Sequence, residues 1–391
     1  MRIVVQKFGG TSVATPSARE LVVKHVLNKI NEGYKTVVVV SAMGRMGDPY
    51  ATDTLLSLLN GRKMEARERD LLISCGEIIS ASVMAALFAD KGYKAKAFTG
   101  FQAGIITDNN FGNAKILDIK PEKILQALQE GIIPVVAGFQ GYTEDLEITT
   151  LGRGGSDTTA VALGAALKAE CVEIFTDVEG IMTADPKLVN NAKMLDEVNY
   201  REVTEMAYNG AKVIHPRAVE LAMQHNIPLR VRSTFSDNQG TLIKLGPEKV
   251  VTGIAHTTHI AQLKIEVPSN DKELESKIFE SLAQKGISID MINIFPDVKI
   301  FTLAEDVVSK ATEVLKELGV SFEVTKNLAK VTVVGGGMMG IPGVMLSIIE
   351  ALKKENIDIL QTSDSHTTIS CLIKEEDVKK AVLALHEKFE L

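Results

Sequence analysis

Residues 1–13 read MRIVVQKFGGTSV, and this stretch decides the expected fold. It holds a short β-branched run that is followed by a lysine and a Gly-Gly pair, as in a strand that leads into a tight turn. Similar runs follow at 36–40, 132–137 and 171–175, and the helical stretch SARELVVKHVLNKI separates the first two. Such alternation is typical of an open, mostly parallel sheet sandwiched by helices. We therefore predict an α/β domain over residues 1–245.

Each of these four runs leads into an unusual turn, and the turns read KFGGTS, SAMGRMGD, AGFQG and TDVEG. In open α/β sheets, ligands gather at the carboxyl ends of the strands. The four turns are therefore expected to share one site.

The last part of the chain is organised differently, because it contains a weak internal repeat with an offset of 70 residues. Ile278 and Leu282 recur as Ile348 and Leu352, and Glu305 recurs as Glu375. Each copy has the pattern helix, strand, strand, helix, preceded by an apolar strand. We predict two small α+β modules of ferredoxin-like type, at 246–325 and 326–391, joined to the first domain through GTLIKLGPEKVVTG.

Composition narrows the classes of partner. The 391 residues include 43 Lys and Arg against 50 Asp and Glu, a formal net charge of −7, so no basic field attracts nucleic acid or an anionic membrane. The longest apolar runs, such as Val37–Val40, are strand-sized, and the N-terminus lacks the pattern of a secretory signal. A cytoplasmic location is expected. Cys75, Cys171 and Cys371 are too widely spaced for a disulfide framework or a thiolate metal site.

Two glycine-rich turns, KFGGTS at 7–12 and LGRGGSD at 151–157, could bring backbone N–H groups close to a phosphate. No G-x-x-x-x-G-K-[ST] motif is present, so the chain is not a P-loop NTPase. Arg153 offers a planar fork for a carboxylate or phosphate. Plain alternatives stay open: a tight turn at the glycines, a helix cap at Ser156 or Asp157, and a solvated lysine at Lys212.

Taken together, the motifs resemble those of the aspartokinases, in the amino-acid-kinase superfamily. The resemblance rests on VQKFGGTSV, SAMG, SCGE, TGFQAGIIT, AGFQG, TTLGRGGSDTTA, FTDVEGIMTADP and GAKVIHPRAVE, in that order, and on a terminal repeat similar to paired ACT modules. It implies an amino-acid-kinase-like sheet followed by two ACT modules. The implied reaction is ATP-dependent phosphorylation of the L-aspartate side chain to 4-phospho-L-aspartate, the first step toward diaminopimelate, lysine, threonine and methionine.

The chemistry of this reaction sets what the site must provide. The attacking carboxylate has an ordinary pKa of about 3.9 and is already ionised at neutral pH, so no general base is required. Positioning and charge neutralisation remain. Mg²⁺ would bridge phosphate oxygens while keeping its waters, so no dedicated metal motif is expected.

The resemblance also implies roles for individual residues. In catalysis, Lys7 and Lys212 would meet the phosphates, and Asp157 would fix the lysines. On the substrate, Arg153 would bind the α-carboxylate and Glu77 the α-ammonium. The further substrate-side positions are Ser41, Thr52 and Ser156, and the further ATP-side positions are Phe8, Gly9, Gly10, Thr176, Asp177, Met182, Thr183, Asp185 and Lys187.

The ACT modules imply feedback control by an amino acid, with a homodimer or higher homo-oligomer formed through them. The string SDSHTTI resembles the subtype controlled by diaminopimelate, so the expected effector is diaminopimelate or lysine, with threonine the lesser candidate. Two segments are candidates for the effector site, residues 340–343 and 363–366, and the second could instead be an ordinary polar connection between strands. The expected effector contacts are Gly340, Ile341, Pro342 and Gly343, followed by Ser363, Asp364, Ser365 and His366.

Three other interpretations compete. Gly335, Gly337 and Gly340 satisfy G-x-G-x-x-G after a strand, but about 50 residues follow, too few to complete a dinucleotide-binding domain. A non-catalytic amino-acid sensor could keep the same fold, although the joint presence of five residues argues against it: Lys7, Glu77, Arg153, Asp157 and Lys212. A sister kinase acting on another acceptor is less consistent with SCGE and GRGGSD.

Overall fold

The computed structural model describes residues 1–211, 213–269 and 271–391, and the chain divides into two units. The first unit holds Met1–Ile181, Met194–Ala207 and 213–247. The second holds Met182–Lys193, Tyr208–Ala211 and the described part of Glu248–Leu391. The domain boundary predicted at 245 stays a prediction, and two short segments that precede it in the chain belong to the second unit.

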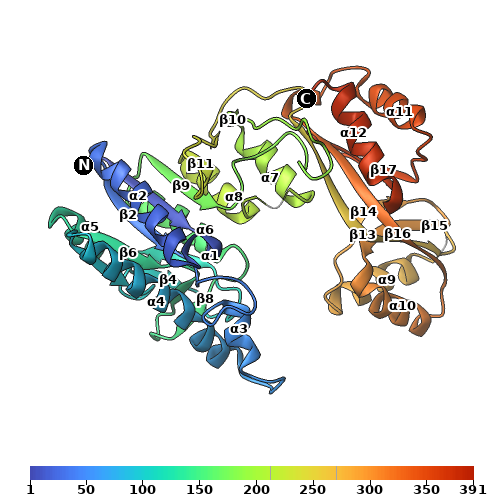
Figure 1. Ribbon diagram of the computed structural model, residues 1–391. Helices are drawn as coiled ribbons and strands as arrows, with labels where there is room; N and C mark the ends of the chain where they lie inside the picture. The colour runs from blue at the N-terminus through green and yellow to red at the C-terminus, as the bar shows by residue number, and fades with distance from the viewer. Residues whose placement is uncertain (212, 270) are drawn as a thin grey trace. The chain divides into compact units, whose positions relative to one another are not determined.

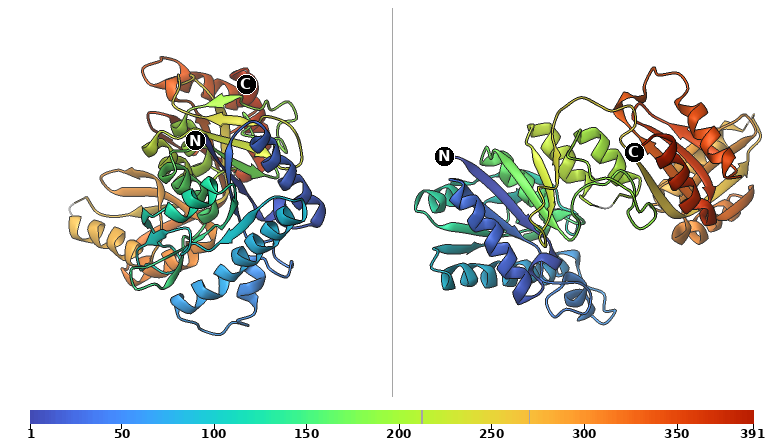
Figure 2. Two further views of the ribbon diagram at one scale, coloured as in Figure 1. Left: turned by 90° about the vertical axis from the view of Figure 1, so that its left-hand side faces the viewer. Right: turned by 45° about the horizontal axis from the view of Figure 1, so that its top comes forward.

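An eight-stranded sheet forms the centre of the first unit within the described residues (Figures 1 and 2). All neighbouring strands are parallel except β11 and β12. This confirms the predicted open, mostly parallel sheet. In spatial order the strands are β10 (Glu197–Val198), β12 (Thr241–Ile243), β11 (Leu229–Ser233), β9 (Cys171–Thr176), β1 (Ile3–Phe8), β2 (Lys35–Val40), β6 (Ile133–Ala137) and β3 (Ala95–Phe98).

Helices cover the sheet, and alternation along β1 shows which face each helix covers. Phe8 packs with residues of α2 (Pro16–Asn31) and α4 (Ala66–Asp90) in one core cluster, which includes Val26, Met84 and Val38. Lys7 points to the opposite face, where α6 (Gly155–Ala166) and α8 (Pro216–His225) pack together. The other helices of this unit are α1 (Gly10–Val13), α3 (Thr52–Ser57) and α5 (Glu122–Gln129), and α7 (Tyr200–Tyr208) ends at the first residue of a second-unit segment.

A four-stranded sheet of order β5-β4-β7-β8 adjoins α4. Its last strand leads directly into the LGRGGSD turn, so this sheet helps to set the position of that turn. Its strands are β4 (Ile105–Thr107), β5 (Ile116–Ile119), β7 (Gln140–Tyr142) and β8 (Ile148–Thr150).

Helix α4 is, within the described residues, long and apolar enough to cross a membrane by length and composition. Half of its apolar window is buried in the fold, and it packs on β3, β6 and β8. It also buries two carboxyl side chains, those of Asp70 and Glu77. These contacts are those of a core helix.

The second unit contains a six-stranded antiparallel sheet of order β14-β15-β13-β16-β18-β17. Its elements repeat with the 70-residue offset seen in the sequence, and this confirms two ferredoxin-like modules. The strands are β13 (Gly253–Glu266), β14 (Asp290–Ile294), β15 (Val298–Ala304), β16 (Ser321–Val334), β17 (Gln361–Asp364) and β18 (Thr368–Lys374). The helices are α9 (Lys272–Gln284), α10 (Val308–Glu317), α11 (Val344–Lys354) and α12 (Val378–Lys388), with 3₁₀ turns at Glu305–Val307, Gly336–Met338 and Glu375–Asp377.

The two long strands β13 and β16 serve both modules. Ile254, near the start of β13, packs in the core of the second module, whereas Ile265, near its end, packs in the core of the first. The first module is therefore inserted into the second. Midway along each strand a residue adopts a left-handed conformation, His259 with φ 60° and Asn327 with φ 57°.

The arrangement differs from the predicted modules 246–325 and 326–391, because the strand segment 253–257 pairs within the second module. A segment from before residue 245 also joins that module. Ala184 and Val189 are buried in its core, and the Thr183 hydroxyl lies 2.9 Å from Nε2 of His386 on α12.

Candidate active site

The alternation of β1 places Lys7 and Phe8 on opposite faces of the sheet. The Phe8 ring stacks on Phe175 with centroids 4.6 Å apart and is fully buried. The Lys7 side chain instead reaches α6, where Nζ lies 2.7 Å from Oδ1 of Asp157. Both side chains are 12% exposed, so this ion pair is largely shielded from water.

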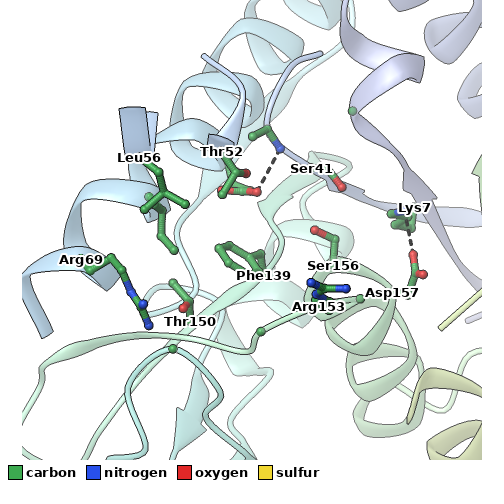
Figure 3. Close-up of a pocket in the computed structure, with 18 of the residues that line it drawn as sticks. Lys7, Ser41, Thr52, Leu56, Arg69, Phe139, Thr150, Arg153, Ser156 and Asp157 are labelled. Atoms are coloured by element: carbon green, nitrogen blue, oxygen red, sulfur yellow. Dashed lines mark hydrogen bonds and ion pairs between the residues drawn. The ribbon is translucent and has the colours of Figure 1, made fainter. Parts of the chain in front are cut away.

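A cavity of about 740 Å³ opens at the carboxyl ends of β1 and β2 (Figure 3). It brings together every predicted catalytic and substrate-side residue that the structure describes. Lys212 lies outside the described residues. The predicted residues that line the cavity are Lys7, Gly10, Ser41, Thr52, Glu77, Arg153, Ser156 and Asp157.

Close backbone contacts explain the glycine of the first turn. A Cβ on Gly10 would lie 2.7 Å from the Gly44 carbonyl oxygen and 2.9 Å from that of Ala42. The Gly44 N–H also donates to the Gly10 carbonyl at 3.0 Å. The turns after β1 and β2 therefore meet backbone to backbone at the cavity wall.

Glu77 has an unusual environment on α4. Its side chain is buried, and Oε1 accepts a hydrogen bond from the Ala42 N–H at 3.0 Å. Oε2 has no hydrogen-bond partner among the described residues. Burial raises the pKa of Glu77 to about 8, although the Ala42 N–H opposes the shift. The carboxyl group is therefore mostly protonated at neutral pH and would ionise beside a cation.

Several side chains of the cavity were not identified from the sequence, among them Arg69, Phe139 and Thr150. Phe139 lies in the AGFQG turn and Thr150 immediately precedes LGRGGSD, so the neighbouring motifs could have indicated both. Arg69 had no sequence signal, because only the packing of α4 brings it to the cavity. Figure 3 shows Arg69 beside Thr150, and Arg153 beside Ser156 and Asp157.

The predicted ATP-side residues are distributed over both units. Phe8, Gly9, Thr176 and Asp177 do not line the cavity, although Gly9 donates its N–H to the Phe175 carbonyl at 3.2 Å. Asp177 pairs with Arg45 at 2.5 Å, so the turns after β2 and β9 are linked. The other predicted ATP-side residues, Met182, Thr183, Asp185 and Lys187, belong to the second unit.

The end of the GAKVIHP motif lies at the LGRGGSD turn. The His215 ring occupies the space that a Cβ on Gly154 would need, with Cγ 2.2 Å from that position. Burial lowers the pKa of His215, which favours its neutral imidazole.

The two predicted effector segments belong to the second module. Residues 340–343 lead into α11, and Gly343 has φ 93°. Ser363 and Asp364 end β17, and Ser365 and His366 lie in the turn to β18, where the Ser365 hydroxyl lies 2.8 Å from that of Thr368. The Gly335 N–H donates to the Thr367 carbonyl at 2.9 Å, which brings the start of the glycine-rich loop beside this turn. The G-x-G-x-x-G pattern is thus a strand-to-helix loop of an ACT module.

Comparison with known proteins agrees with this architecture. The chain matches the amino acid kinase family over residues 2–233 and the ACT domain over residues 323–387. It is 51% identical over 402 residues to aspartokinase 1 of Bacillus subtilis, with 100% of both chains covered.

Solved structures give the same result. E. coli aspartokinase III in complex with aspartate and ADP (R-state) matches with a TM-score of 0.81 at 27% identity, over 100% of both chains. The same enzyme in complex with lysine and aspartate (T-state) matches with a TM-score of 0.78 at 27% identity, over 98% of this chain and 99% of that one. The chain therefore belongs to the aspartokinases of the amino acid kinase family, and it is a kinase with a C-terminal ACT region.

Proposed function

We propose that the side-chain carboxylate of L-aspartate attacks the γ-phosphate of ATP in the cavity at the ends of β1 and β2. One observation carries the proposal: a single cavity joins the shielded Lys7–Asp157 pair with Glu77 and Arg153. The bound aspartate and ADP of the E. coli relative are consistent with this assignment.

Aspartate would be held at both ends of its backbone. Arg153 binds the α-carboxylate with a planar fork, and the buried Glu77 receives the α-ammonium through the unpartnered Oε2. Ser41, Thr52 and Ser156 line the same cavity and supply further polar contacts. With both backbone groups bound, the side-chain carboxylate is the group left to face ATP.

Phosphoryl transfer then needs positive charge where negative charge gathers. Lys7 provides it from β1, and Asp157 holds the ammonium group in one place at 2.7 Å. Lys212 would act from the nucleotide side, as the sequence resemblance implies. The remaining ATP contacts are assigned to Phe8, Gly9 and Gly10 through their backbone and to Thr176, Asp177, Met182, Thr183, Asp185 and Lys187.

The cavity also suits a magnesium ion that arrives with the nucleotide. Among the described lining residues, Asp157 and Glu77 are the carboxyl groups, and Glu77 is mostly protonated at neutral pH. Such a donor set suits an ion that keeps waters and phosphate oxygens as ligands, and Asp157 is the residue that would hold it. When bound, Mg²⁺ would offset charge on the β- and γ-phosphates.

Regulation is assigned to the second module. The effector is diaminopimelate or lysine, with threonine the lesser candidate, and lysine is bound in the T-state structure of the E. coli relative. The proposed contacts are those of Gly340–Gly343 and Ser363–His366. Assembly into a homodimer or higher homo-oligomer through the ACT modules and a cytoplasmic location also stay proposals.

The decisive experiment is ATP turnover with L-aspartate in the presence of hydroxylamine, which converts an aspartyl phosphate to a hydroxamate. We expect hydroxamate formation that is inhibited by diaminopimelate or by lysine. Turnover that threonine alone inhibits would contradict the effector assignment. No hydroxamate under any of these conditions would favour a non-catalytic sensor.

Asp157→Asn tests the phosphoryl end of the site. The variant removes the charge that fixes Lys7, so kcat should fall by roughly 10²-fold or more while KM for aspartate changes little. Steady-state kinetics measure both constants. An unchanged kcat would contradict the role given to Asp157.

A further inference from the structure

The carboxylate of Asp70 is buried without a catalytic role in the proposed mechanism. The side chain lies on α4 and is 0% exposed. Its Oδ2 accepts hydrogen bonds from the Thr150 N–H at 2.7 Å and from the Gly112 N–H at 2.8 Å. Its Oδ1 accepts a third from the Thr150 hydroxyl at 2.9 Å. All three donors belong to residues that line the active-site cavity.

Burying a carboxylate is costly unless hydrogen bonds compensate for lost hydration. Packing α4 against the sheet needs only apolar side chains, such as those of Met84 and Phe88 on the same helix. The unfavourable burial of the Asp70 carboxylate therefore indicates a role in holding the segment that it binds, which is the end of β8.

That segment leads directly to Arg153. Thr150 is the last residue of β8, and Arg153 follows three residues later. Between and beyond them, Gly152 and Gly154 adopt left-handed conformations with φ 74° and φ 68°. A loop with two such glycines has little conformational preference of its own, so its neighbours must fix it.

A second side chain holds the loop from the other side. Arg217, at the start of α8, donates to the Leu151 carbonyl at 3.0 Å and to the Ala114 carbonyl at 2.9 Å. The Ala114 N–H in turn donates to the Thr150 carbonyl at 2.9 Å. The backbone before Arg153 is thus fixed by an acceptor on α4 and a donor on α8.

We infer that Asp70, together with Arg217, is a positioning residue that fixes the Arg153 loop and so sets the affinity for the α-carboxylate of aspartate. The inference rests on the proposed function, because Arg153 is the group assigned to that carboxylate. Neither Asp70 nor Arg217 lines the cavity. Their effect reaches the reaction through the aspartate-binding step.

The first test is the kinetics of Asp70→Asn. The amide oxygen can still accept from the Thr150 and Gly112 N–H groups, but without the negative charge that strengthens these bonds, and its NH₂ group makes the Thr150 hydroxyl an acceptor. The loop is therefore held less firmly. KM for aspartate should rise at least tenfold, while kcat and KM for ATP stay within threefold. Asp90→Asn, at the exposed end of the same helix, is the matched control and should change none of them.

A double-mutant cycle separates positioning from general stabilisation. In an Arg153→Ala background the loop has no fork to position, so Asp70→Asn should lower kcat/KM for aspartate less than twofold. Two results would overturn the inference. One is that Asp70→Asn lowers kcat/KM for aspartate as much in the Arg153→Ala background as in the wild type. The other is that it raises KM for aspartate and KM for ATP equally.

Two further measurements keep the outcome clear. If Asp70→Asn fails to fold, Arg217→Lys takes its place in the same cycle with the same expected results, because lysine cannot reach both carbonyls. The wild-type enzyme is assayed alongside. If the wild-type enzyme does not turn over aspartate, the proposed function itself is refuted. If the wild type is active but the effects of the two substitutions on kcat/KM simply add, the positioning role alone is refuted.

Discussion

Glu77 shows how surroundings change the chemistry of one residue. Its pKa of about 8 means that the folded protein holds a proton there at pH 7, and the proposed contact with the α-ammonium of aspartate would favour the carboxylate instead. Aspartate binding should therefore release close to one proton at pH 7 and much less at pH 9. Titration calorimetry in buffers of different ionisation enthalpy measures this release.

Glu77→Gln is the control, because it cannot release a proton and should bind aspartate more weakly. A binding heat that is independent of buffer at pH 7 would contradict the assignment. The same raised pKa affects stability. Glu77 contributes a stabilising free energy that is present below pH 4.5 and is lost as the pH rises through about 8.

Individual site residues differed in how well the sequence indicated them. Lys7 and Asp157 stand in glycine-rich turns whose composition already suggests a phosphate site. Asp70 stands in the run ARERDLLIS, where a helical carboxylate resembles any solvated one. Its burial depends on contacts with Gly112 and Thr150, 42 and 80 residues away, which no local pattern encodes.

Among the elements, the turn after β1 tolerates little change. In Gly10→Ala the new Cβ would meet two carbonyl oxygens of the next turn, and neither is a flexible side-chain end. The free energy of unfolding should fall by about 1–3 kcal/mol. Denaturant unfolding measures the loss. In Gly246→Ala no described atom lies within 4 Å of the new Cβ, so that variant should be near neutral.

The strand β13 offers a test of its double role. Ile254→Ala removes a side chain from the core of the second module, and Ile265→Ala removes one from the core of the first. Each should cost about 2–5 kcal/mol of local stability. Hydrogen exchange should rise in α11 and α12 for the first variant and in α9 and α10 for the second. Loosening of the same two helices by both variants would contradict the insertion.

The sequence predicted the repeat of these modules but not their interleaving. Identical residues at a 70-residue offset mark the helices, because both copies bury the same helix faces. The first half of β13 follows a stretch rich in glycine and charge, and this context hides it from a prediction based on apolar runs. Pairing of 253–257 with the far end of β16 is a long-range contact, and hydrophobic periodicity does not identify a strand's partner.

At the scale of the whole molecule, the segment Met182–Lys193 carries both a core residue of the second module and several of the proposed ATP contacts. Val189 is fully buried in the second module, and the proposed ATP contacts Asp185 and Lys187 lie a few residues away. Val189→Ala should destabilise the second unit by about 1–3 kcal/mol and raise KM for ATP severalfold. Kinetics and hydrogen exchange check both effects. Asn190→Ala, an exposed change on the same segment, should alter neither.

The insertion of the first module has a consequence for how this chain can be rebuilt. Thr257 and Lys330 are paired neighbours in the sheet, so both ends of the inserted module leave from adjacent points. A short turn joining those two residues would excise the first module and keep every strand of the second. The second module cannot be removed in the same way, because its strands come from both sides of the first module in the chain. The first module can therefore be removed or replaced without breaking the second, and a foreign sensor domain would be inserted between Thr257 and Lys330.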